Sequence, residues 1–136
     1  MFYRRSHRFQ VYSNESLVWS DAKAFCLAQG GALARAKNCD QWLQMIEAAG
    51  AEGPNFIWLD GKKEAGEDVF MCSNKEARLG FPCRFLPFAF GLPQVDEANG
   101  ELCIGIVKLN SLTYVMSADA CTFQLAVMCR FRLDVE

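Results

Sequence analysis

Oxygen-bearing side chains dominate the stretch from Pro93 to Cys103. Carboxylates and amides stand there at Gln94, Asp96, Glu97, Asn99 and Glu101. Calcium prefers six to eight hard oxygen ligands, several of them charged. A proline-containing loop of this composition therefore predicts either a calcium site or a polar ligand-binding surface. For Asp96 and Glu97 taken singly, a solvated loop is the alternative.

Side chains suited to catalysis are scarce. His7 is the only histidine in 136 residues, so Ser-His-Asp or Cys-His chemistry would lack its base. Asp96 and Glu97 are adjacent and would point apart, and the chain has no glycine-rich phosphate loop. We therefore expect no catalytic residues and a protein that is not an enzyme.

Length and charge narrow the class of protein further. The length fits one domain, which we place at residues 9–133 after an N-terminal tail of residues 1–8. The formal net charge is -2 and the only cationic cluster lies in that tail, which argues against nucleic-acid binding. The most apolar run, residues 85–93, is short and broken by prolines and a glycine, so we expect no membrane insertion.

The cysteines predict a disulfide framework. There are seven of them, with no CxxC pair and a single histidine in the chain, which disfavours a zinc site of the usual Cys/His type. Disulfides persist in oxidising compartments. The chain is therefore expected to be secreted, or to be the ectodomain of a membrane protein.

A strand and a helix are expected at the start of the domain. Residues 9–13 alternate in the manner of a strand. Ser16 is then the predicted N-cap of a helix, and Gly30 and Gly31 supply its C-terminal stop. Trp19, Ala22, then Phe25 or Cys26, and Gln29 follow at helical spacing along one face of this helix.

A second helix follows. Asn38 and Gln41, three residues apart, form a capping-box signature. The helix is predicted to end near Gly50, and its buried stripe consists of Trp42, Met45, Ile46 and Ala49.

The second half of the chain predicts strands around a long loop. Residues 55–61 form a short strand closed by Asp-Gly, and residues 68–74 are its hairpin partner or a nearby strand. Residues 74–99 contain no long periodic segment, and loops of that length are usually functional. Three further strands are expected at residues 102–109, 112–116 and 123–131. This order of elements indicates an α+β domain.

Several motifs, in the right order along nearly the whole chain, resemble a C-type lectin-like domain. "VWSDAKAFCLAQGGALA" at 18–34 resembles the first-helix signature of that family, and "FIWL" at 56–59 stands where the family has Trp-Ile-Gly-Leu. "FAFGLPQ" at 88–94 falls on Trp-x-x-Gly-Glu-Pro-Asn, "GELCIGI" at 100–106 on Glu-Asp-Cys-Val, and "CTFQLAVMC" at 121–129 on the closing pair of cysteines. The resemblance implies two helices, small antiparallel sheets and a long loop, in a short-form member that lacks the N-terminal cysteine hairpin.

The resemblance also implies disulfide pairings. Cys26 should bond Cys129, and Cys103 should bond Cys121 across the base of the long loop. Three cysteines then remain. Cys72 either bonds Cys83 or is a buried free thiol, and Cys39 is either a free thiol or forms an intermolecular disulfide in a homodimer.

The family's calcium and sugar site is degraded in this chain. Leu92 replaces the first ligand, Gln94 keeps an amide oxygen, and Glu101 keeps its place two residues before Cys103. The family's Asn-Asp pair falls on 117–118, Ser-Ala here, and Asp119 is the only nearby substitute. Gln94, Glu101 and Asp119 are thus the remaining candidate ligands for calcium, the one cofactor that the resemblance suggests. We expect the standard calcium site to be absent.

These observations predict a non-catalytic, lectin-like recognition domain. It would bind a carbohydrate through the long-loop region, by a non-canonical or calcium-independent site. The candidate ligand-binding residues are Gln94, Asp96, Glu97, Asn99, Glu101, Ser117 and Asp119. The alternative is a protein–protein recognition module that binds neither sugar nor calcium.

Overall fold

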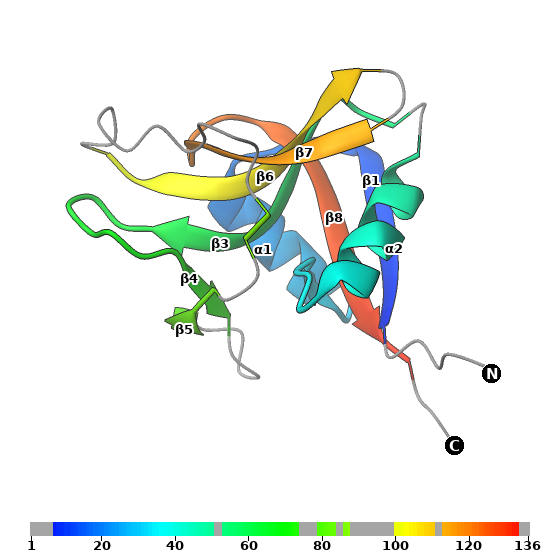
Figure 1. Cartoon of the computed structure of the whole chain (residues 1–136), viewed down its shortest axis with the longest axis horizontal. Coiled ribbons are helices and arrows are strands. Elements are labelled where there is room, and N and C mark those ends of the chain that lie inside the picture. The colour runs from blue at the N-terminus through cyan, green and yellow to red at the C-terminus, as the bar shows by residue number, and fades with distance from the viewer. Residues whose placement is uncertain are drawn as a thin grey trace.

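The computed structural model describes residues 7–50, 53–73, 79–83, 86–87, 100–110 and 113–133. Within these residues the chain forms two helices and eight strands (Figure 1). In chain order they are β1 (His7–Leu17), α1 (Trp19–Ala28), β2 (Ala32–Leu33), α2 (Cys39–Ala49), β3 (Phe56–Lys63), β4 (Met71–Ser73), β5 (Leu79–Pro82), β6 (Leu102–Asn110), β7 (Thr113–Ala120) and β8 (Leu125–Arg132). The predicted α+β class is confirmed.

The strands join into one branched sheet instead of separate small sheets. β8 pairs antiparallel with β1 and β2, and it pairs in parallel with β3 over a short stretch. β3 in turn pairs antiparallel with β4 and with β6, and β6 forms a hairpin with β7. The parallel contact between β3 and β8 is what links the two halves of the sheet.

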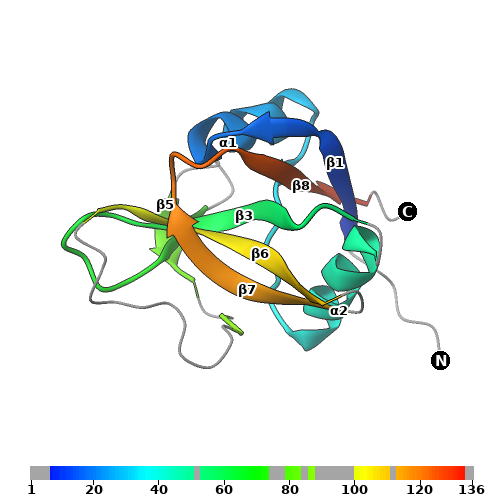
Figure 2. The ribbon, with the colours of Figure 1, turned by 90° about the horizontal axis from the view of Figure 1, so that it is seen from above.

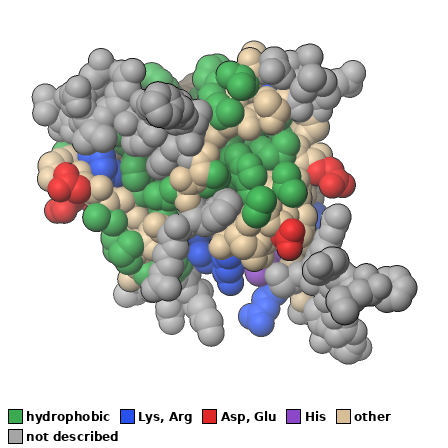
Figure 3. Space-filling view, viewed as in Figure 1, with side chains coloured by type: hydrophobic (Ala, Val, Ile, Leu, Met, Phe, Trp, Pro, Cys, Tyr) green, Lys and Arg blue, Asp and Glu red, His purple; other side chains and the backbone are tan. Residues whose placement is uncertain are grey.

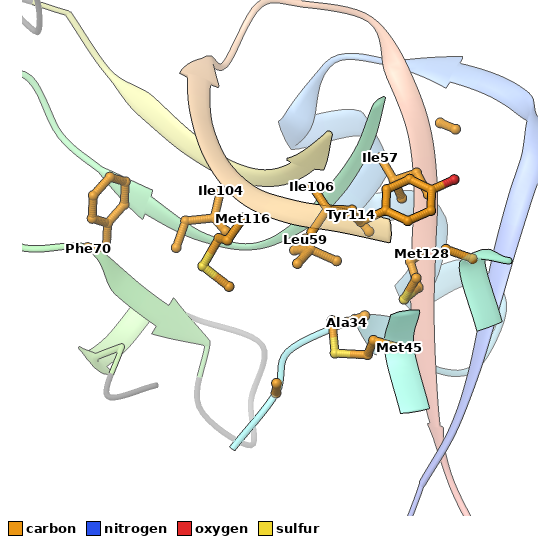
Figure 4. Packing of buried hydrophobic residues seen from close by; sticks show 13 residues of the cluster. Ala34, Met45, Ile57, Leu59, Phe70, Ile104, Ile106, Tyr114, Met116 and Met128 are labelled. Atoms are coloured by element: carbon orange, nitrogen blue, oxygen red, sulfur yellow. The ribbon is translucent and has the colours of Figure 1, made fainter. Parts of the chain in front are cut away.

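The two helices cover opposite faces of this sheet (Figure 2). Successive residues of a strand point to opposite faces, and along β8 they alternate between two cores. Val127 and Cys129 pack in the cluster that contains Trp19 of α1. Ala126 and Met128 pack in the cluster that contains Met45 of α2. Figure 4 shows Met45 and Met128 facing each other across the second of these cores.

β1 is longer than the sequence pattern indicated. It begins at His7 and pairs with β8 from His7 opposite Arg132 to Tyr12 opposite Val127. Residues 7 and 8, which we expected in the N-terminal tail, therefore lie in the sheet. Ladder pairing explains the difference, because β8 extends to Arg132 and offers backbone partners that a local sequence pattern does not reveal.

His7 titrates in a positively charged environment. Partial burial, and then the charges of Arg130, Lys37, Arg132 and Arg35, hold the pKa of His7 below its ordinary value of 6.5. As the pH falls through 6.5, the unfolded chain therefore binds a proton before the folded chain does. The free energy of unfolding must decrease over that window and level off once the folded chain is protonated as well.

We expect His7→Gln to remove this pH dependence. Urea unfolding at about pH 7.5 and about pH 5 should show a smaller loss of stability on acidification in the variant than in the parent chain. Titrating carboxylates contribute equally to both chains and cancel in the difference. An equal or larger acid-induced loss in the variant would contradict the predicted direction of the pKa shift.

α1 starts later than predicted, and the prediction that Ser16 is its N-cap was wrong. β1 continues to Leu17, which pairs with Leu125 of β8, so the chain is still extended at Ser16. Val18 occupies the N-cap position and makes no side-chain capping bond. Of the residues predicted on one face, Trp19, Ala22 and Cys26 are buried, whereas Phe25 is partly buried and Gln29 is exposed.

α2 follows its capping signal closely. The Asn38 side chain accepts a hydrogen bond from the Gln41 amide at 2.9 Å, and the Gln41 side chain accepts one from the Lys37 amide at 2.8 Å. Gly50, with φ of +71°, follows the last helical residue. Met45 and Ala49 are buried as predicted. Within the described residues, neither helix is long and apolar enough to cross a membrane.

β3 runs through the Asp-Gly pair where the sequence predicted its end. Gly61 has φ of +134°, and the register between β3 and β6 shifts between Trp58 and Lys62, as in a β-bulge. The glycine therefore permits a local distortion without a turn. After it, Lys62 lies opposite Cys103 of β6.

Two other strands differ from expectation. β5 is a short strand in the stretch where we expected a long loop without a long periodic segment, and it pairs antiparallel with β4. β7 extends to Ala120, beyond the predicted range of 112–116. In both cases hydrogen bonding to a neighbouring strand supplies the regularity that the local sequence lacks.

Candidate functional site

Three of the seven candidate ligand-binding residues lie in the described part of the chain. These are Glu101, immediately before β6, and Ser117 and Asp119 on β7. The other four, and with them most of the predicted long loop, lie outside the described residues: Gln94, Asp96, Glu97 and Asn99. The candidate site is therefore built here from the strands at the base of that loop.

Three strands bring polar side chains onto one face. Cys103 of β6 lies opposite Lys62 of β3 on one side and opposite Asp119 of β7 on the other. Gly105 lies opposite Trp58 and Ser117 in the next row. Directly opposed residues share a face of a sheet. We call the polar group at this place the hairpin-base site, which consists of Lys62, Glu64, Glu101, Ser117 and Asp119.

A lysine holds two carboxylates at one edge of this site. The Lys62 ammonium lies 3.1 Å from Glu64 Oε1 and 3.4 Å from Glu101 Oε2. Partial burial disfavours the charged ammonium, but the hydrogen bonds and charges of Glu64 and Glu101 outweigh it and raise the pKa of Lys62. Both carboxylates are about half exposed, so the pair stays accessible to a ligand.

A hydroxyl and a carboxylate pair at the other edge. Ser117 Oγ donates a hydrogen bond to Asp119 Oδ2 at 3.1 Å. Ser117 is buried and Asp119 is partly exposed. The hydrogen bond orients a carboxylate at the surface, where its second oxygen can accept from a ligand hydroxyl.

A disulfide and a buried tryptophan fix the strands that carry these groups. Cys103 and Cys121 are joined by a disulfide, as the resemblance implied. The Trp19 amide donates to the Cys121 carbonyl at 3.1 Å, and the Trp19 indole donates to the Leu59 carbonyl at 2.9 Å. The Lys62 ammonium lies 5.9 Å from the Trp19 ring. The start of α1 thus ties β3 to the end of the β6–β7 hairpin.

The described residues do not fit a calcium site. In the described residues, Glu101 is ion-paired with Lys62, and one oxygen of Asp119 accepts a hydrogen bond from Ser117. Across the described ranges, no group of three or more His, Cys, Asp or Glu side chains is placed to hold a metal ion. Gln94, the third candidate ligand, lies outside those ranges.

Sequence reasoning missed Lys62 and Glu64. Both follow the Asp-Gly pair that was interpreted as the end of a strand, so they lay outside the predicted strands. Only the bulge at Gly61, and the pairing of β3 with β6, places Lys62 beside Glu101. The single signal in the sequence was the run of charges after Gly61, which alone does not indicate a partner.

The remaining cysteines resolve into one more disulfide and one free thiol. Cys26 joins Cys129, as the resemblance implied, and Cys72 joins Cys83. Cys72 is therefore not the buried free thiol that was the alternative. Cys39 is exposed and has no disulfide partner within the chain. A disulfide between the Cys39 residues of two copies stays a prediction.

Solved structures similar to this chain were found, although neither a protein-family model nor a curated protein matches it. One is the carbohydrate-recognition domain of the mouse scavenger receptor C-type lectin, with a TM-score of 0.76 and 12% identity, covering 99% of this chain and 95% of the other. A second is TC14, a C-type lectin from the tunicate Polyandrocarpa misakiensis, with a TM-score of 0.70 and 16% identity over 94% and 99% of the two chains. A third is a calcium-independent type II antifreeze protein, with a TM-score of 0.72 and 14% identity over 96% and 90%.

Proposed function

Because this chain is a domain of the C-type lectin-like fold, we propose that it is a non-catalytic recognition domain that binds a carbohydrate without calcium. The proposed contact surface is the hairpin-base site, together with the long-loop candidates Gln94, Asp96, Glu97 and Asn99. The observation that carries the proposal is the Lys62 ammonium held between Glu64 and Glu101. A fixed cation neutralises the carboxylates that would otherwise attract calcium.

The hairpin-base site offers the chemistry that sugar hydroxyls require. Each hydroxyl both donates and accepts a hydrogen bond, and adjacent hydroxyls are well matched by paired donors and acceptors. Glu101 and Asp119 supply acceptors and Lys62 supplies donors. Phe123, two residues beyond Cys121, is 53% exposed and offers an aromatic face for the apolar side of a sugar ring.

The similar structures support both parts of the proposal. One of them is a carbohydrate-recognition domain and another is a calcium-independent protein, so the fold accommodates sugar binding in one case and independence from calcium in another. The three disulfides fit an oxidising compartment. We therefore propose that the domain works outside the cell, in a secreted protein or an ectodomain.

Binding to a glycan array should be the same in calcium and in EDTA. Melting temperature should also be the same in the two solutions, because the Lys62 ammonium already neutralises Glu64 and Glu101. A calcium site filled to about 100 times its Kd would add about 2.7 kcal/mol of stability and raise the melting temperature by several degrees. A calcium-dependent rise of that size, reversed by chelator, would contradict the calcium-independent site.

Glu101→Gln should weaken binding of the best array glycan by about tenfold or more, since hydrogen bonds to charged groups are each worth about 1.5–3 kcal/mol. Glu67→Gln is the matched control, because Glu67 is exposed on the β3–β4 connection and lies outside the hairpin-base site. Equal binding by the two variants would remove Glu101 from the site. No array binding by the parent chain in either solution would favour the alternative function, recognition of a protein.

A further inference from the structure

A second group of charged side chains lies away from the hairpin-base site. We call it the basic cluster, and it consists of His7, Arg35, Lys37, Arg130 and Arg132. Arg130 lies opposite Phe9 of β1 and Ala32 of β2, and Arg132 lies opposite His7. His7, Phe9, Arg130 and Arg132 therefore share one face where β1 begins and β8 ends. Figure 3 shows Lys and Arg side chains beside the histidine on the lower edge of the molecule.

Positive charge in this cluster exceeds negative charge. Arg35 Nε lies 3.9 Å from Asp60 Oδ2, and its guanidinium stacks 4.9 Å from the centre of the Phe81 ring. Asp60 is 3% exposed, and both of its oxygens already accept hydrogen bonds from the amide and the hydroxyl of Ser73, each at 2.9 Å. Among the described residues, Asp60 is the carboxylate that pairs with an arginine of the cluster, in a chain whose formal net charge is -2.

Two of the arginines are incompletely satisfied. The Nε atoms of Arg35 and Arg130 are buried, and among the described residues neither donates to a hydrogen-bond partner. Burial lowers the pKa of both guanidinium groups. The charge of Arg35 lowers the pKa of Arg130 further, and the charges of both arginines contribute to the lowered pKa of His7. Unsatisfied buried donors are unfavourable. An anion that accepts from the outer N–H groups of these guanidiniums would offset their mutual repulsion.

The chemistry of the cluster selects an oxyanion. Guanidinium groups present several N–H donors in a plane and bind sulfate, phosphate or carboxylate oxygens in pairs. Exposed Lys37 and Arg132 add charge at the surface, where a ligand would approach.

A hollow next to the cluster indicates what carries the oxyanion. It has a volume of about 380 Å³, within the range of small-ligand sites, and His7 lines both the hollow and the cluster. Phe9 and Leu133 give it apolar walls, and Gln44 and Glu47 of α2 give it acceptors for hydroxyl groups. A sugar ring matches this mixture, whereas a bare inorganic anion would leave the hollow unused.

We propose that the basic cluster binds the sulfate groups of an acidic glycan, whose sugar ring occupies the adjoining hollow. This site is independent of the hairpin-base site and lies on different strands. An oxidising, extracellular setting, which the three disulfides favour, is where sulfated glycans occur.

The sole histidine makes the test direct. A heparin hexasaccharide, added at low ionic strength, should shift the C2 proton resonance of His7 and raise its NMR-measured pKa, because sulfate offsets the cations that lower it. The desulfated hexasaccharide should produce neither change. An unchanged His7 resonance at saturating heparin hexasaccharide would overturn the proposal.

Charge-removing variants locate the site. Lys37→Gln and Arg132→Gln alter exposed side chains and should each weaken hexasaccharide binding by about tenfold, as expected for the loss of a charged contact. Lys23→Gln is the control, because it removes the same charge from α1. Calorimetry should show less than about a twofold loss for that control.

Two results would contradict the assignment. An equal loss in Lys23→Gln and Lys37→Gln would mean that the hexasaccharide senses only total charge. Tighter binding of a phosphorylated peptide than of the hexasaccharide would exclude a sulfated glycan as the preferred ligand. Glu101→Gln should leave hexasaccharide binding intact, so this test is separate from that of the hairpin-base site.

Discussion

Replacing both Cys26 and Cys129 with alanine is expected to lower the free energy of unfolding by about 4–5 kcal/mol. This disulfide joins residues 103 apart in sequence, and it ties α1 to β8 at the centre of the sheet. A disulfide that closes a long loop removes much conformational entropy from the unfolded chain. Loss of this disulfide should therefore destabilise the domain more than loss of a disulfide that closes a short loop. Urea unfolding of the alanine pair against the parent chain measures the difference.

The Cys72–Cys83 disulfide is the internal control for this prediction. It spans 11 residues, so replacing both of its cysteines should cost only about 3 kcal/mol. Both disulfides lie within the same domain, and the two double substitutions remove the same atoms. A larger loss from the short loop than from the long one would contradict the loop-entropy explanation.

Trp58→Ala is expected to be comparably severe. Trp58 is fully buried on β3, packs in the core beneath α1, and its indole donates to the Leu17 carbonyl at 2.8 Å. On the adjacent strand, a Cβ at Gly105 would lie only 2.8 Å from the Ile57 carbonyl oxygen, so the glycine permits the close approach of β6 to this part of β3. Large-to-small substitutions of buried aromatic residues cost about 3–5 kcal/mol. Domains of this kind are stable by only about 5–15 kcal/mol, so the variant should be close to unfolding.

Phe56→Ala on the same strand gives the matched control. Phe56 is also aromatic, but it is 46% exposed, so its truncation should cost well under half as much. Thermal unfolding followed by circular dichroism compares the two variants. Equal losses would mean that burial at position 58 does not determine the stability of this strand.

The parts of the fold that depend on local signals were predictable. The capping pair Asn38 and Gln41, the apolar stripe of α2 and the buried face of α1 all follow from residue spacing. The bonds Cys26–Cys129 and Cys103–Cys121 followed from the resemblance and not from residue spacing. Features of this kind are encoded within one turn of a helix or in the order of cysteines.

The parts that depend on partner strands were not predictable. β1 extends to His7 and Leu17 because β8 lies beside it, and β3 passes through Gly61 because β6 accepts a bulge there. The same limit applies to the candidate site. Glu101 was named from the sequence, but its partner Lys62 lies 39 positions earlier and was found only through strand pairing.

The basic cluster illustrates this limit at the level of charge. In the sequence, the only contiguous cationic cluster lies in the N-terminal tail. The residues of the basic cluster are separated by nearly a hundred positions, from Arg35 and Lys37 to Arg130 and Arg132. The pairing of β8 with β1 and β2 brings them together. A chain with a negative formal net charge can therefore present a positive surface, which composition alone argued against.

Calcium-independent glycan binding at the hairpin-base site is tested most directly by NMR. The backbone amides of the chain would be followed while the neutral glycan that binds best on the array is added in EDTA. We predict shifts at Lys62, Glu101, Ser117 and Asp119, and none at His7 or Arg130. Shifts that appear only after calcium is added, or that leave β6 and β7 unchanged, would contradict the proposed site.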